Sequence, residues 1–192
     1  IRLLQGTPAP LHAALLLALW VLLSGALHLD GLADSADAWL GGFGDRERTL
    51  RIMKDPRSGP MAVVTLVLVL LLKFCALWVL VEQGVTAHLL LAPLLGRAAM
   101  LGLFLCTPYV RPGGLGQALA EHLPRRAAGW VLLGCALFCL WLGGWSVVLA
   151  LAVFAWLRQL MCRRLGGTTG DTAGALLELL ELAVVLGMAL GL

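Results

Sequence analysis

The sequence predicts an all-α, polytopic membrane helix bundle with about six transmembrane helices, arranged as a single domain over residues 1–192. Three observations predict this fold class. Hydrophobic residues make up 60% of the chain and charged residues only 13%, which is outside the usual range of soluble globular domains. Apolar runs close to the length of a bilayer-spanning helix recur along the whole chain. The basic residues concentrate in the connections between these runs.

Six apolar runs predict the helices in order. They cover residues 11–29, 60–81, 86–105, 127–142, 145–161 and 173–192, and the fourth and fifth are short for a bilayer crossing. The three longer polar connections span 30–59, 106–126 and 162–172. With six crossings they lie on one side of the membrane, and ten of the 14 basic residues lie in them. The positive-inside bias then places that side in the cytoplasm.

Three aspartates follow the first apolar run at helical spacing. Asp30, Asp34 and Asp37 stand at positions i, i+4 and i+7, so a helix that continues through them carries all three carboxylates on one stripe. Carboxylates stacked in this way repel one another unless a divalent cation lies between them. Hard oxygen ligands suit Mg²⁺, which usually also takes phosphate oxygens of a substrate. We therefore expect a Mg²⁺ site here, against the alternative of a solvated helix end.

A short amphipathic helix is predicted after Asp45, which is its expected N-cap. The cations in and after this helix are suited to binding a pyrophosphate, and Lys54 and Arg57 are candidate phosphate ligands. A helix lying on anionic lipid headgroups would carry the same cations, so that alternative stays open. Asp55 is either a further metal ligand or a salt-bridge partner.

A glycine-rich turn precedes the last predicted helix. The backbone N–H groups of such a turn, together with the positive end of the following helix, favour an anion. Glycine-rich turns also join membrane helices routinely, so the motif gains weight only from its two arginines. The candidate phosphate contacts in this connection are Arg163, Arg164, Thr168 and Thr169, and Asp171 is a candidate proton acceptor.

Ionisable residues also occur inside the predicted spans, where each needs a partner or a wet cavity to offset its cost in lipid. They are Lys73, Arg97, Glu178 and Glu181. Ion pairs between the two cations and the two glutamates are one interpretation, and a substrate cavity cut into the bundle is the other. His28, two residues before Asp30, is a candidate acid, base or phosphate contact.

Three blocks of this sequence resemble the cobalamin synthase family. They are H-L-D-G-L-A-D-S-A-D at 28–37, R-I-M-K-D-P-R-S-G at 51–59 and R-R-L-G-G-T-T-G-D-T-A-G-A-L-L-E-L-L-E at 163–181. They occur in the family's order, with P-Y-V-R-P-G-G-L-G at 108–116 between them, and the resemblance covers nearly the whole chain. Family members have a further N-terminal stretch with another apolar segment, so we expect that this chain lacks an N-terminal segment.

The resemblance implies a Mg²⁺-dependent adenosylcobinamide-GDP ribazoletransferase. Such an enzyme joins adenosylcobinamide-GDP to alpha-ribazole or its 5'-phosphate with release of GMP, a late step of cobalamin biosynthesis. It implies a multi-pass protein of the bacterial inner membrane with its active site facing the cytoplasm. Asp30, Asp34 and Asp37, with Asp55, would then bind Mg²⁺, and Asp34, Asp171 and His28 are the candidate catalytic residues. Its partners are small-molecule substrates and the lipid bilayer, not nucleic acid, and a homo-oligomer stays open.

Two other functions were weighed against this one. A CDP-alcohol phosphotransferase also holds Mg²⁺ with spaced aspartates, but its D-G-x-x-A-R run is missing, since Ser35, Ala36 and Asp37 follow Asp34. A transporter subunit would line its pathway with the ionisable residues of the spans. The charges gather at one membrane face instead of running through it, which favours an active site over a translocation route.

Overall fold

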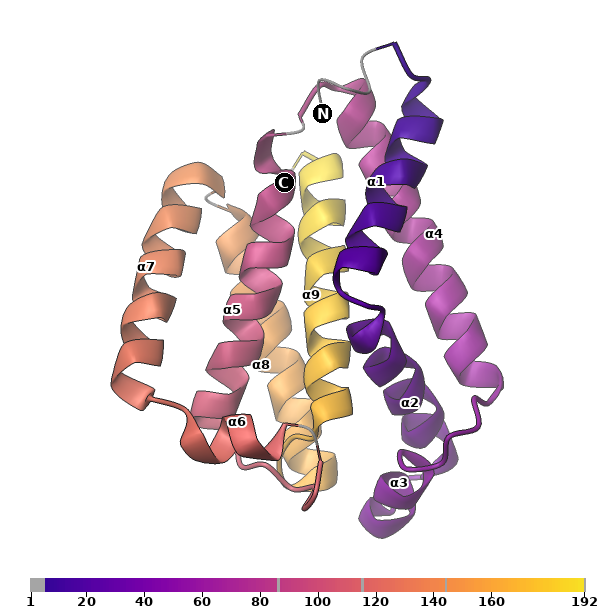
Figure 1. Ribbon diagram of the computed structural model, residues 1–192, viewed down its shortest axis with the longest axis vertical. Coiled ribbons are helices and arrows are strands. Elements are labelled where there is room, and N and C mark those ends of the chain that lie inside the picture. The colour runs from indigo at the N-terminus through magenta and orange to yellow at the C-terminus, as the bar shows by residue number, and fades with distance from the viewer. Residues whose placement is uncertain (1–5, 86, 115, 144, 192) are drawn as a thin grey trace.

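A computed structural model describes residues 6–85, 87–114, 116–143 and 145–191, which form helices joined by loops (Figure 1). The elements are α1 (Ala9–Leu23), α2 (Leu27–Gly41), α3 (Arg46–Ile52), α4 (Pro60–Glu82), the 3-10 helix η2 (Ala87–Leu90), α5 (Leu91–Cys106), α6 (Gln117–His122), α7 (Arg125–Gly143), α8 (Trp145–Leu165) and α9 (Gly170–Ala189). Five spans are long and apolar enough to cross a membrane, and the bent pair α1–α2 makes a sixth if it counts as one. The predicted all-α membrane bundle is confirmed.

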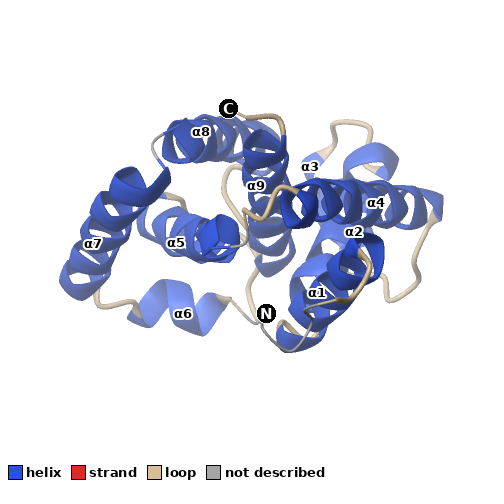
Figure 2. Cartoon of the chain, turned by 90° about the horizontal axis from the view of Figure 1, so that it is seen from above, coloured by secondary structure: helices blue, strands red, loops and turns tan. Residues whose placement is uncertain are grey.

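Helix α9 forms the centre of the bundle. It packs against α2, α4, α5 and α8, and 72% of its most apolar window is buried inside the protein. Seen from above, α9 lies between α5 and α8 on one side and α2 and α4 on the other, whereas α7 stands at the edge (Figure 2). The outer helices α4 and α7 expose large leucine, valine and tryptophan side chains. Lipid as the surrounding solvent accounts for this inside-out distribution.

The first predicted helix, 11–29, does not run straight into the aspartates. α1 ends at Leu23 and α2 begins at Leu27, after a bend of 86°. Gly25 and Ala26 both adopt positive φ, 60° and 57°, and thereby turn the chain. Apolar periodicity carries no signal for such a break inside an unbroken apolar run. The aspartates therefore lie on a separate helix, α2, whose direction differs from that of α1.

Helices α2 and α9 meet backbone to backbone. A Cβ atom added to Gly31 would lie 2.8 Å from the carbonyl oxygen of Asp171, and one added to Gly174 would lie 3.2 Å from the carbonyl oxygen of His28. Small residues allow this close approach, as is common between membrane helices. The contact fixes the aspartate-bearing helix against the first turns of α9.

The three long polar connections meet at one end of the bundle, the lower end of Figure 1, as expected. The backbone N–H of Val110 donates to the carbonyl oxygen of Thr168 at 2.9 Å, and the N–H of Thr168 donates to the carbonyl of Pro108 at 2.8 Å. Nε of Arg46 donates to the carbonyl of Leu165 at 2.7 Å. These bonds connect the end of α8 and the α8–α9 loop to α3 and to the segment between α5 and α6.

Two elements at this end, α8 and α6, differ from the prediction. α8 continues to Leu165, four residues beyond the predicted end at 161, so Arg163 and Arg164 lie in its last turn instead of in a loop. The predicted helix after Asp45 is present, and the Asp45 side chain accepts a hydrogen bond from the N–H of Arg48 at 2.7 Å, as an N-cap does. Helix α6 was not predicted, because its six residues are too short for a periodic signal.

Replacing Gly31 by alanine should force α2 and α9 apart, because the new methyl group would meet the backbone of Asp171 at 2.8 Å. Overpacking of this kind costs about 1–3 kcal/mol, so we expect a lower melting temperature for the detergent-solubilised protein, followed by circular dichroism. Gly134→Ala on α7 is the matched control, since no atom lies within 4 Å of its new Cβ. Equal melting temperatures for the two variants would contradict the close contact.

Candidate active site

Asp30 lies in the first turn of α2, close to the break from α1, and Asp34 lies at the middle of that helix. Asp30 is exposed and Asp34 is half-buried. The charged side chains near enough to act on Asp34 are Asp30, Asp37, Asp171 and Arg111. The tertiary structure thus adds a fourth carboxylate and one guanidinium to the predicted stripe, drawn from α9 and from the segment between α5 and α6.

Arg111 lies in the connection between α5 and α6. It forms an ion pair with Asp171 in the first turn of α9. Its position is set by the backbone bonds that join Pro108 and Val110 to Thr168, the residue that lies just before α9. Arg111 was not among the predicted site residues. Its local sequence is only a proline- and glycine-rich turn, and the resemblance of residues 108–116 to the family was the one available signal.

Asp37, the third aspartate of the stripe, binds backbone groups. One carboxylate oxygen accepts from the N–H of Ala62 at 3.0 Å and the other accepts from the N–H of Gly59. A Cβ on Gly59 would lie 2.7 Å from that carboxylate, so a larger residue here would displace the Asp37 side chain. Asp37 therefore caps the amino end of α4, where a negative charge is favourable, and fixes the position of α2 relative to α4.

Two of the charged residues that follow α3, Asp55 and Arg57, contact each other. Asp55 pairs with Arg57 at 2.8 Å, and this hydrogen-bonded guanidinium lowers the pKa of the Asp55 carboxyl to about 2. Of the two roles left open for Asp55, the structure has the salt bridge. Lys54 and Arg57 are exposed to solvent. Within the described part of the chain, no three His, Cys, Asp or Glu side chains are arranged to hold a metal ion by themselves.

The two threonines proposed as phosphate donors are completely buried. Oγ1 of Thr169 accepts from the N–H of Thr172 at 3.2 Å and Oγ1 of Thr172 accepts from the N–H of Thr169 at 2.9 Å, a reciprocal capping box at the start of α9. The hydroxyl of Thr168 lies 3.0 Å from that of Thr172. Both hydroxyls are thus committed to the fold, and we do not assign them to phosphate.

The two arginines in the last turn of α8 differ in their contacts. Arg164 donates from Nη2 to the carbonyl oxygen of Trp39, and its guanidinium lies 5.0 Å from the centre of the Trp39 ring. That pairing holds α8 against α2, so Arg164 has a structural contact in place of the expected phosphate. Arg163 is exposed and stays available to bind an anion.

The ionisable residues inside the spans pair with one another, as one of the two interpretations predicted. Nζ of Lys73 lies 2.6 Å from a Glu178 oxygen and 2.8 Å from a Glu181 oxygen, and all three side chains are almost fully buried. Arg97 reaches Glu181 at 3.3 Å. His28 lies within electrostatic reach of this group, and its Nδ1 is a buried atom without a hydrogen-bond partner among the described residues.

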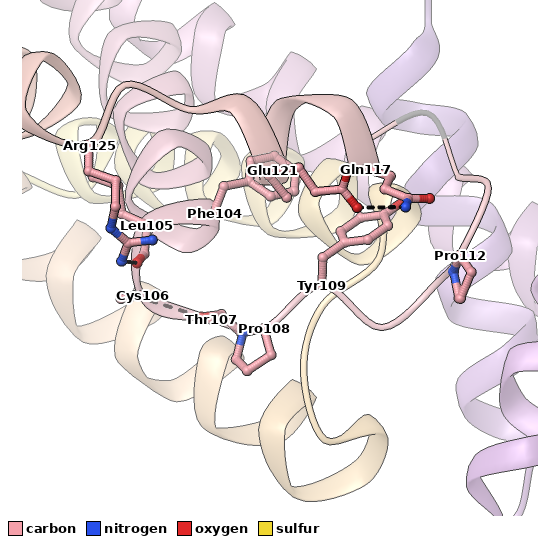
Figure 3. Close-up of a pocket in the computed structure, with 11 residues that line it drawn as sticks. Phe104, Leu105, Cys106, Thr107, Pro108, Tyr109, Pro112, Gln117, Glu121 and Arg125 are labelled. Carbon is pink, nitrogen blue, oxygen red and sulfur yellow. Dashed lines mark hydrogen bonds between the residues drawn. The ribbon is translucent and has the colours of Figure 1, made fainter.

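An open pocket of about 740 Å³ adjoins the Arg111 segment (Figure 3). Tyr109, two residues before Arg111, and Pro112, the residue after it, both line this pocket. Gln117 and Glu121 of α6 lie beside the Tyr109 ring and are joined by a hydrogen bond of 2.6 Å. The pocket thus offers the aromatic rings of Phe104 and Tyr109, the amide of Gln117 and the carboxylate of Glu121 beside the segment that carries Arg111.

Comparisons with known proteins show the family to which this chain is similar. The family described as cobalamin-5-phosphate synthase (CobS) matches residues 1–189. Proteins named adenosylcobinamide-GDP ribazoletransferase are similar throughout: that of Pseudomonas putida KT2440 is 92% identical over 191 residues, covering 100% of this chain and 80% of the relative. Those of Pseudomonas entomophila and Pseudomonas fluorescens Pf-5 are 80% and 74% identical, covering 98% of this chain and 79% of each relative.

No solved structure is significantly similar to this chain. Family membership therefore rests on the sequence matches, which extend from the aspartate-bearing helix to the final one. The chain belongs to the CobS family of cobalamin-5-phosphate synthases, whose members are transferases.

Proposed function

We propose that this chain is a Mg²⁺-dependent transferase that joins adenosylcobinamide-GDP to alpha-ribazole or its 5'-phosphate. GMP leaves, and adenosylcobalamin or its 5'-phosphate forms. The single observation that carries the proposal is the gathering of Asp30, Asp34, Asp171 and Arg111 at one end of the bundle. The names of relatives up to 92% identical support the choice of substrates.

The residues present fit a Mg²⁺ ion that is shared with a substrate. Mg²⁺ in phosphate-transferring sites is commonly held by one or two carboxylates, the remaining ligands being water and phosphate oxygens. Asp30 and Asp34 would hold it, because Asp37 caps α4 and Asp55 is paired with Arg57. When bound, the ion supplies neutralisation of the pyrophosphate charge.

The side chains around this position account for the other requirements of the reaction. Arg111 interacts electrostatically with Asp34 and can bind a phosphate oxygen while it holds Asp171. The exposed cations Lys54, Arg57 and Arg163 lie at the same end and provide a positive approach for the nucleotide. A ribose hydroxyl of the ribazole attacks the phosphorus bound to cobinamide, and the bond to GMP breaks. The hydroxyl proton has two acceptors in the cluster, Asp34 and Asp171.

We place this chemistry at the cytoplasmic face of the bacterial inner membrane. The basic side chains gather at the end that carries the carboxylates, in the connections around α3, α6 and the α8–α9 loop. Short connections rich in Lys and Arg remain on the cytoplasmic side during insertion. Water-soluble nucleotide substrates reach that side directly.

GMP release by the detergent-solubilised protein tests the proposal. We expect release only when adenosylcobinamide-GDP, alpha-ribazole 5'-phosphate and Mg²⁺ are all present, and none after chelation of the metal. Release that does not depend on the ribazole would point to a hydrolase. Absence of release together with turnover of a CDP-alcohol would refute the transferase assignment in favour of the competing enzyme class.

Asp34→Asn should abolish turnover without preventing membrane insertion, because the amide neither carries the negative charge nor accepts the proton. The measurement is GMP release per mole of purified protein, with the yield of folded protein from size-exclusion chromatography as the control. Glu47→Gln, on the exposed face of α3, is a matched loss of one carboxylate at the same end. An Asp34→Asn enzyme with wild-type activity would remove this residue from the site.

Arg111→Lys should lower kcat by roughly tenfold or more while the protein stays folded. Lysine keeps the charge but lacks the planar fork that can hold Asp171 and a phosphate at once. Steady-state kinetics of GMP release give kcat and KM for each substrate. Arg126→Lys, exposed in the first turn of α7, serves as the matched control. If both variants kept the wild-type kcat, Arg111 would have no part in the reaction.

A further inference from the structure

The guanidinium of Arg97 is exposed at a depth where lipid should surround it. Arg97 stands midway along the candidate span His88–Cys106, about 13 Å from its end at Cys106 at 1.5 Å per residue. Its side chain is nevertheless 47% exposed, whereas Lys73 in the same ionic cluster is 3% exposed. An arginine that faced hydrocarbon at this depth would be costly, so the exposed half requires water or a ligand.

The contacts of Arg97 leave most of its hydrogen-bond donors unused. Nη1 donates to the carbonyl oxygen of Pro93 at 3.1 Å and to Glu181 at 3.3 Å. Within the described residues, Nε and Nη2 have no protein acceptor. Glu181 is already bound to Lys73 at the shorter distance of 2.8 Å. Arg97 is therefore the member of the cluster with charge and donors left for a further anion.

The α9 residue that each segment contacts shows how far into the bundle the aspartates, His28 and Arg97 lie. Gly31 of α2 touches α9 at Asp171, His28 touches it at Gly174, and Gly96, the neighbour of Arg97, touches it at Leu177 and Glu181. At 1.5 Å per residue, Arg97 lies about 5–10 Å deeper than His28. His28 interacts electrostatically with Arg97. The α2 aspartates and His28 therefore lie against the first turns of α9, and Arg97 of α5 lies against the turns that follow.

We propose that Arg97 binds the 5'-phosphate of the ribazole substrate, an inference that rests on the proposed function. At 1.5 Å per residue, the α9 positions beside the carboxylates and beside Arg97 are about 9–15 Å apart, a span that a ribose phosphate covers together with the hydrogen bonds at its two ends. A lipid headgroup does not reach mid-membrane depth, which leaves a substrate phosphate as the anion. His28 lies between the two ends, where the ribose of the bound nucleotide would be.

The test compares two acceptors that differ only in this phosphate. For Arg97→Gln, we expect kcat/KM with alpha-ribazole 5'-phosphate to fall about ten- to a hundredfold relative to kcat/KM with alpha-ribazole, the range for losing charge-assisted hydrogen bonds. Arg97→Lys, which keeps the charge and a partner for Glu181, should give an intermediate ratio. Arg126→Gln, exposed on α7, should leave the ratio unchanged.

Each alternative gives a different result. An equal loss with both acceptors would mean that Arg97 only supports Glu181, and a raised KM for adenosylcobinamide-GDP alone would assign the phosphate to the donor; both overturn the proposal. Binding of the two acceptors, measured by titration calorimetry, tests Arg97 independently of turnover. If the wild-type protein turned over neither acceptor, the proposed function would fail, whereas tighter binding of the phosphorylated acceptor, lost in Arg97→Gln, would still support the phosphate site.

Discussion

The backbone contact between α2 and α9 is the constraint on which the rest of the site depends. Glycine at 31 and 174 removes the Cβ atoms that would separate the two helices. The carboxylates of α2 are thereby placed beside Asp171 at the start of α9, and Arg111 meets them only because its segment is bonded to Thr168. In a membrane, apolar contact between helices is not favoured over contact with lipid tails. Close packing of small residues therefore fixes the position of one helix against another.

Some polar groups in this bundle are bound to other groups of the fold, whereas others stay exposed and can bind a ligand. Thr168, Thr169, Asp37 and Arg164 resemble phosphate or metal ligands in sequence, yet each is bound to backbone groups or to another hydroxyl of the fold. Asp30 and Arg97 remain exposed. A buried polar group without a partner is expensive, and apart from the buried Nε of Arg164 the fold binds the first set internally and leaves the second set for substrate, metal or water.

The ionic cluster around Lys73 contains both buried, paired charges and one partly exposed charge. Lys73 lies between Glu178 and Glu181 and is nearly inaccessible, which joins α4 to α9 in the apolar interior. Removing one partner of such a group would strand a buried charge, so the cluster is retained as a unit. Arg97 extends the same cluster toward the exposed side through Glu181. One set of charges therefore both holds α4 against α9 and connects α9 to α5.

The sequence by itself determined the helical membrane fold, the common end of the three basic connections and the family, because hydropathy, charge placement and ordered motifs are local properties of the chain. It also placed Asp30 and Asp34 correctly on one helix. Only the tertiary structure decided that this helix is separate from α1, that Asp37 and Thr169 serve as caps, and that Arg111 joins Asp171. These outcomes depend on which groups meet across α2, α4 and α9, and spacing along one segment carries no information about contacts between segments.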